Sequence, residues 1–525
     1  MKNKSFVFFF KKSFFSLLGI LFFVLFGVSC SETPGNPPVT CGEDCDLPPD
    51  TTQVLPSDSL EQPPTGPNDS SKTEPTPNPN TPEDSIHTPR LEPGSFGCNP
   101  KNVIMMVCDG CGFNQFIASD YYHFGEKEKQ AFYRFPVSMA MSTHHLQGNS
   151  YDSQAAQEDP KWVWRGFTDS GASATALSTG VKTNNQRIGF DQTDSPVPHA
   201  VEVAYQTGRA SGVVTSMPIS HATPAGFVAH IHNRKRYEVI APQMIFESTL
   251  NVLLGTGHPY YDNNGFPRTN PDFQWLGDDE SVYLQLKAGT AQNLLGAWTF
   301  IDSKEDFDRY LSLSSQELPE QLLGIAPIDF SLQVARTGGP NELNLIVGEH
   351  PKVASVPDLR SLSTIALNVL AKNEKGFYLM IEGGAIDEAS HNHSIARVIE
   401  EIDDFNNAVD GVVQWIEQHG GFNDNLLIIT ADHETGYLIG PNAYDEETGF
   451  IDYELVNNGV GQIPGHSFNS TAHTNQLVPL FAKGGCDDKI QTSAVGTDFR
   501  HGSYSDNAVL GALVQEILKS TGHSH

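Results

Sequence analysis

The feature that most constrains this chain is a series of short, continuous apolar runs that recur from Phe96 onward. Runs of strand length occupy residues 103–107, 212–214, 377–381 and 426–429. Stretches with a helical spacing of apolar residues lie at 395–416 and 508–518. Continuous apolar strands that alternate with helices are typical of a mostly parallel sheet with helices on both faces. The sequence therefore predicts an α/β fold, in which ligands bind at the carboxyl ends of the strands.

The charge of the chain narrows the range of its partners. Its 525 residues include 32 Lys and Arg against 63 Asp and Glu, a formal net charge of -31. So acidic a chain lacks the broad basic surface with which proteins bind nucleic acid. We therefore expect no nucleic-acid-binding surface, and we expect small molecules or metal cations as partners.

Residues 1–29 have the pattern of a secretory signal peptide. Basic residues precede an apolar run at 14–28, and no acidic residue interrupts it. A retained transmembrane anchor is the alternative, but the run is short for a bilayer and polar, Pro-rich chain follows it. Cys30 resembles the lipidated cysteine of bacterial lipoproteins, although Gly27 stands where that motif usually has an aliphatic residue. Ordinary cleavage near Ser29 therefore remains open.

Residues 30–95 are expected to form a disordered tether. Residues 31–95 hold 15 of the 34 prolines, twelve acidic residues and no Phe, Trp or Tyr. Such a segment buries too little apolar surface to offset its chain entropy. A recognition motif is the alternative interpretation. The predicted location is the periplasm or the cell surface, with an outer-membrane lipoprotein anchored at Cys30 as one form, and membrane contact is expected only through that anchor.

Six cysteines remain after Cys30, and an even number in an exported protein permits disulfides. They are Cys41, Cys45, Cys98, Cys108, Cys111 and Cys486, whose pairing the sequence leaves open. Cys108 and Cys111 flank Asp109 in a C-x-x-C spacing, which also occurs in redox and zinc motifs. Because no second C-x-x-C pair is present, we favour the interpretation that both are small buried residues of the core.

Carboxylates follow three of the predicted strands. Asp109 comes after the first strand, Glu382 and Asp387 come after the third, and Asp432 comes after the fourth. One acidic residue after a strand is commonly a helix cap or a turn former. Three such positions with histidines beside them favour a metal centre instead.

The spacing of the histidines supports this interpretation. Asp387 and His391 are four residues apart at the start of a predicted helix, so both side chains lie on one face. His433 directly follows Asp432 at a strand end. Mixed oxygen and nitrogen donors suit zinc in an open, catalytic coordination sphere. His473 is a further candidate nitrogen donor.

Ser170 is the candidate nucleophile. Small residues with moderate to good helix propensity follow it, so it lies where a helix is predicted to begin. The positive end of the helix dipole favours an anion near the Ser170 oxygen. A simple Ser N-cap is the alternative, but a nearby set of metal ligands favours the nucleophile.

Together these positions resemble the motifs of the alkaline phosphatase family, in the order in which that family carries them. The matching motifs are Val107-Cys108-Asp109-Gly110, Thr168-Asp169-Ser170, Gly180-Val181-Lys182-Thr183, His221-Ala222-Thr223-Pro224-Ala225, Asn233-Arg234-Lys235, Glu382-Gly383 with Asp387 and His391, Thr430-Ala431-Asp432-His433, and His473-Thr474. The resemblance implies a three-layer sandwich over residues 96–525. It also implies a phosphate monoester hydrolase that releases inorganic phosphate through a phosphoserine intermediate.

The resemblance further implies a role for each matching residue. It assigns Asp387, His391 and His473 to one zinc ion, Asp109, Asp432 and His433 to a second, and Asp109, Thr223 and Glu382 to a third ion, usually magnesium. Ser170 is the implied nucleophile, and Arg234 grips two phosphate oxygens. Asp169 and Glu388 are expected neighbours of the phosphate site, and His221 is an expected neighbour of the third ion.

Two positions depart from the best-known bacterial members. His221 stands where those members carry Asp, which leaves the identity of the third metal open. Glu388 stands where members often have Lys, His or Trp, and a carboxylate there would repel phosphate. An insertion is expected near residues 258–341, bordering the site or a dimer interface, and the family commonly forms homodimers.

Two other functions remain open. One alternative is that the same scaffold acts on phosphodiesters or sulfate esters, although Arg234, Thr223 and Glu382 favour the dianion of a monoester. A tethered metal- or phosphate-binding lipoprotein without turnover is the alternative from another class, and the intact Ser170 argues against it.

Overall fold

The computed structural model describes residues 91–520 except 340–344 and 443–451. The predicted signal peptide, Cys30 and nearly all of the predicted tether, with Cys41 and Cys45, lie outside the described residues. Within the described ranges, no helix combines the length and the apolar character needed to cross a membrane.

The centre of the fold is an eleven-stranded sheet in the order β16-β17-β2-β15-β10-β1-β9-β3-β4-β8-β7. Seven strands from β10 to β7 run parallel, and β15 pairs antiparallel with both β10 and β2. The strands of this sheet are β1 (Asn102–Cys108), β2 (Val137–Ser142), β3 (Ala210–Pro218), β4 (Val252–Thr256), β7 (Thr299–Ile301), β8 (Leu322–Ile325), β9 (Phe377–Gly383), β10 (Asn425–Thr430), β15 (Val478–Gly484), β16 (Gly496–Asp498) and β17 (Gly502–Asp506). The four strands predicted from apolar runs are all central members of this sheet.

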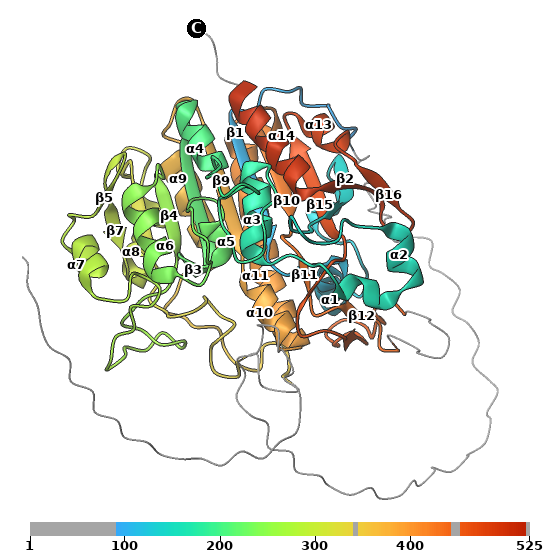
Figure 1. Cartoon of the computed structure of the whole chain (residues 1–525). Coiled ribbons are helices and arrows are strands. Elements are labelled where there is room, and N and C mark those ends of the chain that lie inside the picture. The colour runs from blue at the N-terminus through green and yellow to red at the C-terminus, as the bar shows by residue number, and fades with distance from the viewer. Residues whose placement is uncertain (1–90, 340–344, 443–451, 521–525) are drawn as a thin grey trace, which may run out of the picture. The chain divides into compact units, whose positions relative to one another are not determined.

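Helices cover the sheet on both faces, which confirms the predicted three-layer α/β class. The long helices are α1 (Phe113–Phe124), α3 (Ser170–Thr179), α9 (Leu359–Leu370), α11 (Ile395–Gln418) and α14 (Asn507–Ser520). Helix α14 packs on α3 and on α4 (Ala200–Gln206), whereas α11 packs on α1 and α9. In Figure 1, α3, α4 and α14 lie in front of the central strands. Helices α11 and α14 confirm the two helical stretches predicted from apolar spacing.

Shorter elements complete the described chain. The remaining α-helices are α2 (Ser153–Glu158), α5 (Ala222–Ala225), α6 (Tyr237–Pro242), α7 (Ser281–Lys287), α8 (Lys304–Ser312), α10 (Ala385–His391), α12 (Gly421–Asp424) and α13 (Asp487–Gln491). The remaining strands are β5 (Gln292–Asn293), β6 (Gly296–Ala297), β11 (Glu434–Thr435), β12 (Leu438–Ile439), β13 (Ser467–Phe468) and β14 (His473–Thr474). The segment 258–341, in which an insertion was expected, supplies β7 and β8 to one edge of the main sheet.

The register of the central strands brings three strand ends level with one another. Val107 of β1 pairs with Glu382 of β9 on one side and with Thr430 of β10 on the other. The loops that follow these strands therefore leave the sheet at the same edge, which is the lower edge in Figure 1, near α10 and β11.

Two disulfides are present among the described cysteines. Cys98 is bonded to Cys486, and Cys108 is bonded to Cys111. Cys108 and Cys111 are fully buried, as expected. They also form a disulfide with each other, which corrects the interpretation of the two cysteines as small core residues alone.

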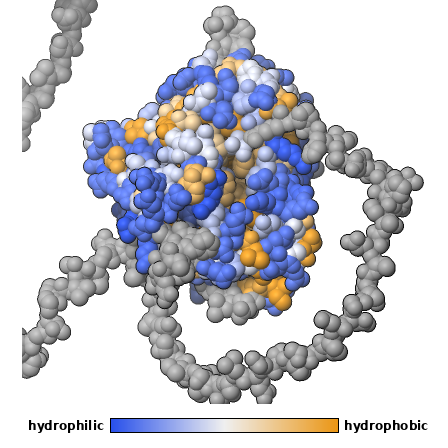
Figure 2. Space-filling model, turned by 90° about the vertical axis from the view of Figure 1, so that its right-hand side faces the viewer, coloured by the Kyte–Doolittle hydropathy of each residue, from blue (hydrophilic) through white to orange (hydrophobic). Residues whose placement is uncertain are grey.

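On the face shown in Figure 2, hydrophilic residues predominate and apolar residues form small groups, because the apolar strands are covered by helices.

Candidate active site

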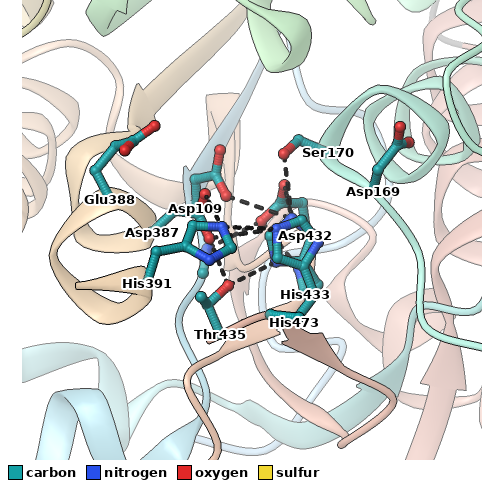
Figure 3. Close-up of polar contacts among 12 residues, drawn as sticks. Asp109, Asp169, Ser170, Asp387, Glu388, His391, Asp432, His433, Thr435 and His473 are labelled. Carbon is teal, nitrogen blue, oxygen red and sulfur yellow. Dashed lines mark hydrogen bonds and ion pairs between the residues drawn. The ribbon is translucent and has the colours of Figure 1, made fainter. Parts of the chain in front are cut away.

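Three acidic segments meet at the edge where β1, β9 and β10 end. Asp109 follows β1, Asp387 lies on α10 directly after β9, and Asp432 follows β10. Figure 3 shows these carboxylates converging with the rings of His391, His433 and His473. Parallel strands thus bring together residues that are distant in sequence, as the strand-end argument predicted.

The first predicted set of metal ligands is close-packed. His391 Nε2 lies 3.2 Å from Asp387 Oδ2 and 3.2 Å from His473 Nε2, and His473 Nε2 lies 3.6 Å from Asp387 Oδ1. Ligand atoms of Asp387, His433 and His473 also fall within 4.8 Å of one another. The His391 side chain is 30% exposed, so the cluster opens to solvent on this side.

The second predicted set lies deeper. His433 Nε2 is 3.1 Å from Asp432 Oδ2 and 3.6 Å from Asp109 Oδ1, and all three side chains are fully buried. Ligand atoms of this set also lie within 4.8 Å of one another. Because His433 belongs to both groupings, the two sets form one continuous cluster.

The third predicted set contributes oxygen donors alone. Thr223, on α5, donates a hydrogen bond from Oγ1 to Asp109 Oδ2 at 3.2 Å. Glu382 is fully buried at the end of β9 and accepts a hydrogen bond from Thr215. Asp109 therefore faces the second and third sets at once.

Backbone carbonyls orient two of the three histidines. Nδ1 of His391 lies 2.7 Å from the carbonyl oxygen of Thr471, and Nδ1 of His473 lies 2.8 Å from that of Thr168. A carbonyl oxygen only accepts, so each Nδ1 carries the proton and directs Nε2 toward the cluster. Thr435 does the same for His433, because its Oγ1 donates to Asp387 and accepts from His433 Nδ1 at 3.2 Å.

The charges of the cluster are suited to cations. Burial, reinforced by Asp432 and other carboxylates, raises the pKa of Asp109 well above its usual range. Burial also raises the pKa of Asp432 to about 8 and that of Glu382 to about 7. One oxygen of each of these three side chains accepts no hydrogen bond within the described residues. Buried, closely spaced carboxylates with unused oxygens fit divalent cations, which would supply the missing contacts.

Protonation of the histidines depends on the same charges. Burial lowers the pKa of His391, but the neighbouring Asp387 carboxylate outweighs burial and raises this pKa to about 9. Burial raises the pKa of Asp387, but His391 and His473 outweigh burial and hold this pKa well below its usual range. Burial, together with His473, lowers the pKa of His433 well below its usual value. A cation bound at Nε2 of His391 takes the place of a proton there.

Ser170 is the first residue of α3, and its hydroxyl faces the cluster. Ser170 Oγ lies 3.2 Å from His433 Nε2. Figure 3 shows Ser170 pointing toward the histidines and carboxylates of the cluster. The N-cap is Asp169, whose carboxylate accepts from the backbone N–H of Ala172 at 2.8 Å. The alternative of a Ser170 N-cap is therefore wrong, because the preceding residue caps the helix and leaves the Ser170 hydroxyl directed at the cluster.

Arg234 lies beside the start of the same helix. Its Nη1 is 3.5 Å from Asp169 Oδ2, and its side chain is 15% exposed. The aliphatic part of the Arg234 side chain packs beside Gly171, since a Cβ added to Gly171 would lie 3.6 Å from both Cβ and Cδ of Arg234. Asp169 thus joins the helix cap to the arginine, a role that its sequence position alone did not indicate.

The two positions that depart from the family pattern lie near the cluster. His221 is buried at the start of α5, and burial, together with Arg234, lowers its pKa to about 3. Glu388 is half-buried on α10 and lies to one side of the cluster in Figure 3. Burial, reinforced by Asp387, raises the pKa of Glu388 to about 7.

Sequence reasoning missed the residues that hold the predicted ligands in place. Thr435 bonds Asp387 and His433, and Thr215 bonds Glu382. Ser173, one turn after Ser170, donates from Oγ to the carbonyl oxygen of Asp432 at 2.7 Å. The only available signal was that Thr435 and Ser173 each lie three places after a predicted site residue, and Thr215 carried no such signal.

Replacing Ser173 by alanine is expected to reduce both stability and turnover. Ser173 Oγ also accepts a hydrogen bond from Asn507 Nδ2 at 2.9 Å, so alanine removes two buried hydrogen bonds, of which Asn507 Nδ2 keeps only a longer one to the Thr143 carbonyl at 3.4 Å. We expect a loss of about 1–3 kcal/mol in the free energy of unfolding. A fall of about tenfold in kcat is also expected, because the bond joins α3 to the loop of Asp432. Denaturant unfolding and kcat at saturating metal measure the two effects.

Ser363 provides the matched control for that variant. It is buried on α9, and among the described residues its hydroxyl bonds only the Leu359 carbonyl of its own helix, at 2.7 Å. Ser363→Ala is expected to leave kcat unchanged. Equal effects of the two substitutions on kcat would rule out a link through Ser173.

Comparison with known proteins identifies the family. The family model described as alkaline phosphatase matches residues 100–458, and the chain belongs to this family. Alkaline phosphatase 3 of Bacillus subtilis is 29% identical over 346 residues, which cover 65% of this chain and 62% of that protein. Alkaline phosphatase of Escherichia coli is 30% identical over 370 residues, covering 65% of this chain and 72% of that protein.

Solved structures of the same family share the fold. Alkaline phosphatase from the Antarctic bacterium TAB5 is 25% identical, with a TM-score of 0.55 over 80% of this chain and 98% of that one. The cold-active enzyme of a Shewanella species is also 25% identical, with a TM-score of 0.56 over 79% and 99% of the two chains. The match to Bacillus subtilis alkaline phosphatase 4 spans 52% of that relative, so the chain aligns with only part of the length of some curated relatives.

Proposed function

We propose that this protein is a metal-dependent phosphate monoester hydrolase that acts through a phosphoserine at Ser170. The observation that carries the proposal is the approach of Ser170 Oγ to His433 Nε2, 3.2 Å apart, at the edge of a buried cluster of carboxylates and imidazoles. A hydroxyl at a helix N-terminus beside cation ligands is suited to nucleophilic attack on an anionic ester. Membership of the alkaline phosphatase family supports this assignment.

The donor atoms suggest which ions the cluster would hold. Two sets with nitrogen and oxygen donors suit zinc, and these are Asp387, His391 and His473, and Asp109, Asp432 and His433. The third set, Asp109, Thr223 and Glu382, has only oxygen donors and suits magnesium. His221 would lie beside this third ion. Bound cations would neutralise the phosphate oxygens, lower the pKa of the serine hydroxyl and stabilise the departing alkoxide.

The chain's own residues would then carry the transfer. Ser170 Oγ loses its proton to water and attacks phosphorus in line, the P–O bond to the alcohol breaks, and the departing alkoxide takes a proton from water. The guanidinium of Arg234 holds two phosphate oxygens through its planar fork, and Asp169 keeps that guanidinium beside α3. Water then attacks the phosphorus of phosphoserine, which restores Ser170 and releases inorganic phosphate.

Comparing a monoester with a diester tests the substrate class. For p-nitrophenyl phosphate and its bis-ester, we expect kcat/KM to favour the monoester by roughly 100-fold, equivalent to about 3 kcal/mol. The extra charge of the dianion interacts with Arg234 and with the cations. Arg234→Ala should narrow this ratio. Preference for the diester or for a sulfate ester would contradict the proposal, and binding of zinc and phosphate without turnover would favour the binding-protein alternative.

We also propose that the protein is exported and acts in the periplasm or at the cell surface on exported or environmental esters. The pattern of residues 1–29, the Pro-rich tether and Cys30 support this location. The two disulfides are consistent with an oxidising compartment.

Labelling with radioactive palmitate, with Cys30→Ala as the control, tests the lipid anchor. Light scattering of the purified chain tests the proposed homodimer.

A further inference from the structure

The Cys108–Cys111 disulfide closes the turn that carries Asp109. The turn leaves β1 at Cys108, and α1 begins at Phe113 shortly after it. Both cysteines are fully buried. A catalytic disulfide needs a sulfur that a thiolate can reach, so burial argues against a redox role.

The backbone of this turn is bonded to the other two strand ends of the cluster. The N–H of Asp109 donates to the carbonyl of Gly383 at 3.0 Å, at the end of β9. The N–H of Gly110 donates to Asp432 Oδ1 at 3.2 Å, and the carbonyl of Gly110 accepts from the N–H of Thr435 at 3.1 Å. Any movement of the turn therefore disturbs the loop that carries Asp432 and His433.

The same turn is packed against the segment that carries Asp387. Gly110 has φ +77°, a left-handed conformation that favours glycine. A Cβ added to Gly110 would lie 2.6 Å from Asp387 Cα, so the two backbones are in close contact. The turn thus contacts the protein segments of all three candidate metal sites, and the disulfide restrains it directly.

We propose that the Cys108–Cys111 disulfide is a positioning element for the metal centre, which holds Asp109 in the orientation shared by the second and third sites. This inference rests on the proposed metal-dependent function. A ring of four residues limits the backbone angles of Asp109 and Gly110 before a cation binds, so less conformational entropy is lost on binding. Residues that orient metal ligands typically change metal affinity by about 10–100-fold.

The second disulfide provides a matched control. Cys98 and Cys486 are separated by 388 positions, and their bond joins the segment before β1 to the start of α13. In the chain-entropy model, a disulfide that closes a long loop stabilises the fold more than one that closes a short loop. Loss of the Cys108–Cys111 bond should therefore mainly weaken metal binding. Loss of the Cys98–Cys486 bond should mainly lower the stability of the whole fold.

Double alanine variants of the full chain test this proposal. For Cys108→Ala/Cys111→Ala, we expect the zinc dissociation constant, measured by competition with a coloured chelator, to rise about 10–100-fold. For Cys98→Ala/Cys486→Ala, we expect a larger fall in melting temperature and a zinc dissociation constant within about threefold of the parent. The single variant Cys111→Ala breaks the bond and keeps one sulfur, so it should match the first double variant.

Three results would overturn the proposal. The first is an unchanged zinc affinity without the Cys108–Cys111 bond, and the second is an equal weakening of zinc binding in both double variants. The third is the presence of free thiols at Cys108 and Cys111 when the unreduced, unfolded parent is alkylated and mapped by mass spectrometry. Zinc affinity is measured independently of turnover. A parent that binds zinc in a disulfide-dependent way but hydrolyses no monoester would overturn the proposed function and support the positioning role.

Discussion

Replacing Ser170 by alanine is expected to lower kcat for a phosphate monoester by at least about 10⁴-fold, the scale seen when a nucleophile is removed from a covalent mechanism. The hydroxyl oxygen is the only heavy atom lost, and it lies 3.2 Å from His433 Nε2. Helix α3 keeps its Asp169 cap, so the fold and the bound metal should be retained. Steady-state kinetics and metal analysis of the purified variant measure both parts.

The control for this variant is Ser178→Ala, farther along the same helix. Ser178 Oγ lies 2.6 Å from the carbonyl oxygen of Gly226 and 2.9 Å from His199 Nδ1, so its loss should reduce stability by about 1–3 kcal/mol and leave turnover intact. Acid quenching with labelled phosphate should trap phosphoserine in the parent and in Ser178→Ala. Substantial turnover by Ser170→Ala with full metal content would exclude Ser170 as the nucleophile.

Removing divalent cations with a chelator is expected to abolish monoester hydrolysis and to lower the melting temperature by roughly 5–10 °C. Asp109, Glu382 and Asp432 are buried close together, and burial with the neighbouring carboxylates raises the pKa of each, so they lack balancing cations. A ligand that binds only the folded state stabilises it by mass action. Activity and melting temperature should both return when zinc and magnesium are added.

The double variant Asp432→Asn/His433→Gln controls for other effects of the chelator. It lacks two ligands of the second site, so it should be inactive and its melting temperature should respond less to chelation. Full activity in parent protein shown by metal analysis to hold no cation would contradict the metal-dependent mechanism.

The sequence predicted the central part of the fold and the composition of the cluster for a physical reason. Buried parallel strands must be continuously apolar, so β1, β9 and β10 stand out from their surroundings. Side chains that follow such strands leave the sheet at one edge, so Asp109, Asp387 and Asp432 were expected to meet. Helical spacing likewise predicted α11, because its apolar residues pack on α1 and α9.

The supporting contacts were not predictable, because they depend on the three-dimensional register of the loops. Thr435 and Thr215 have no local pattern that separates them from other threonines near strand ends. The cap at Asp169 and the pairing of Cys108 with Cys111 are decided by backbone angles that periodicity does not specify. The contribution of β7 and β8 to the edge of the sheet is also a long-range pairing, and their short runs gave little signal.

The metal cluster has a consequence for the order in which this protein matures. Gly110 and Asp432, which hydrogen bond to each other, are 322 positions apart, and β1 pairs with both β9 and β10. Contacts between such distant segments form late, because closing long loops costs conformational entropy. A folding chain therefore assembles the candidate cation site only when its central strands have paired. Binding of a cation by the cluster would thus distinguish fully folded molecules from partly folded ones.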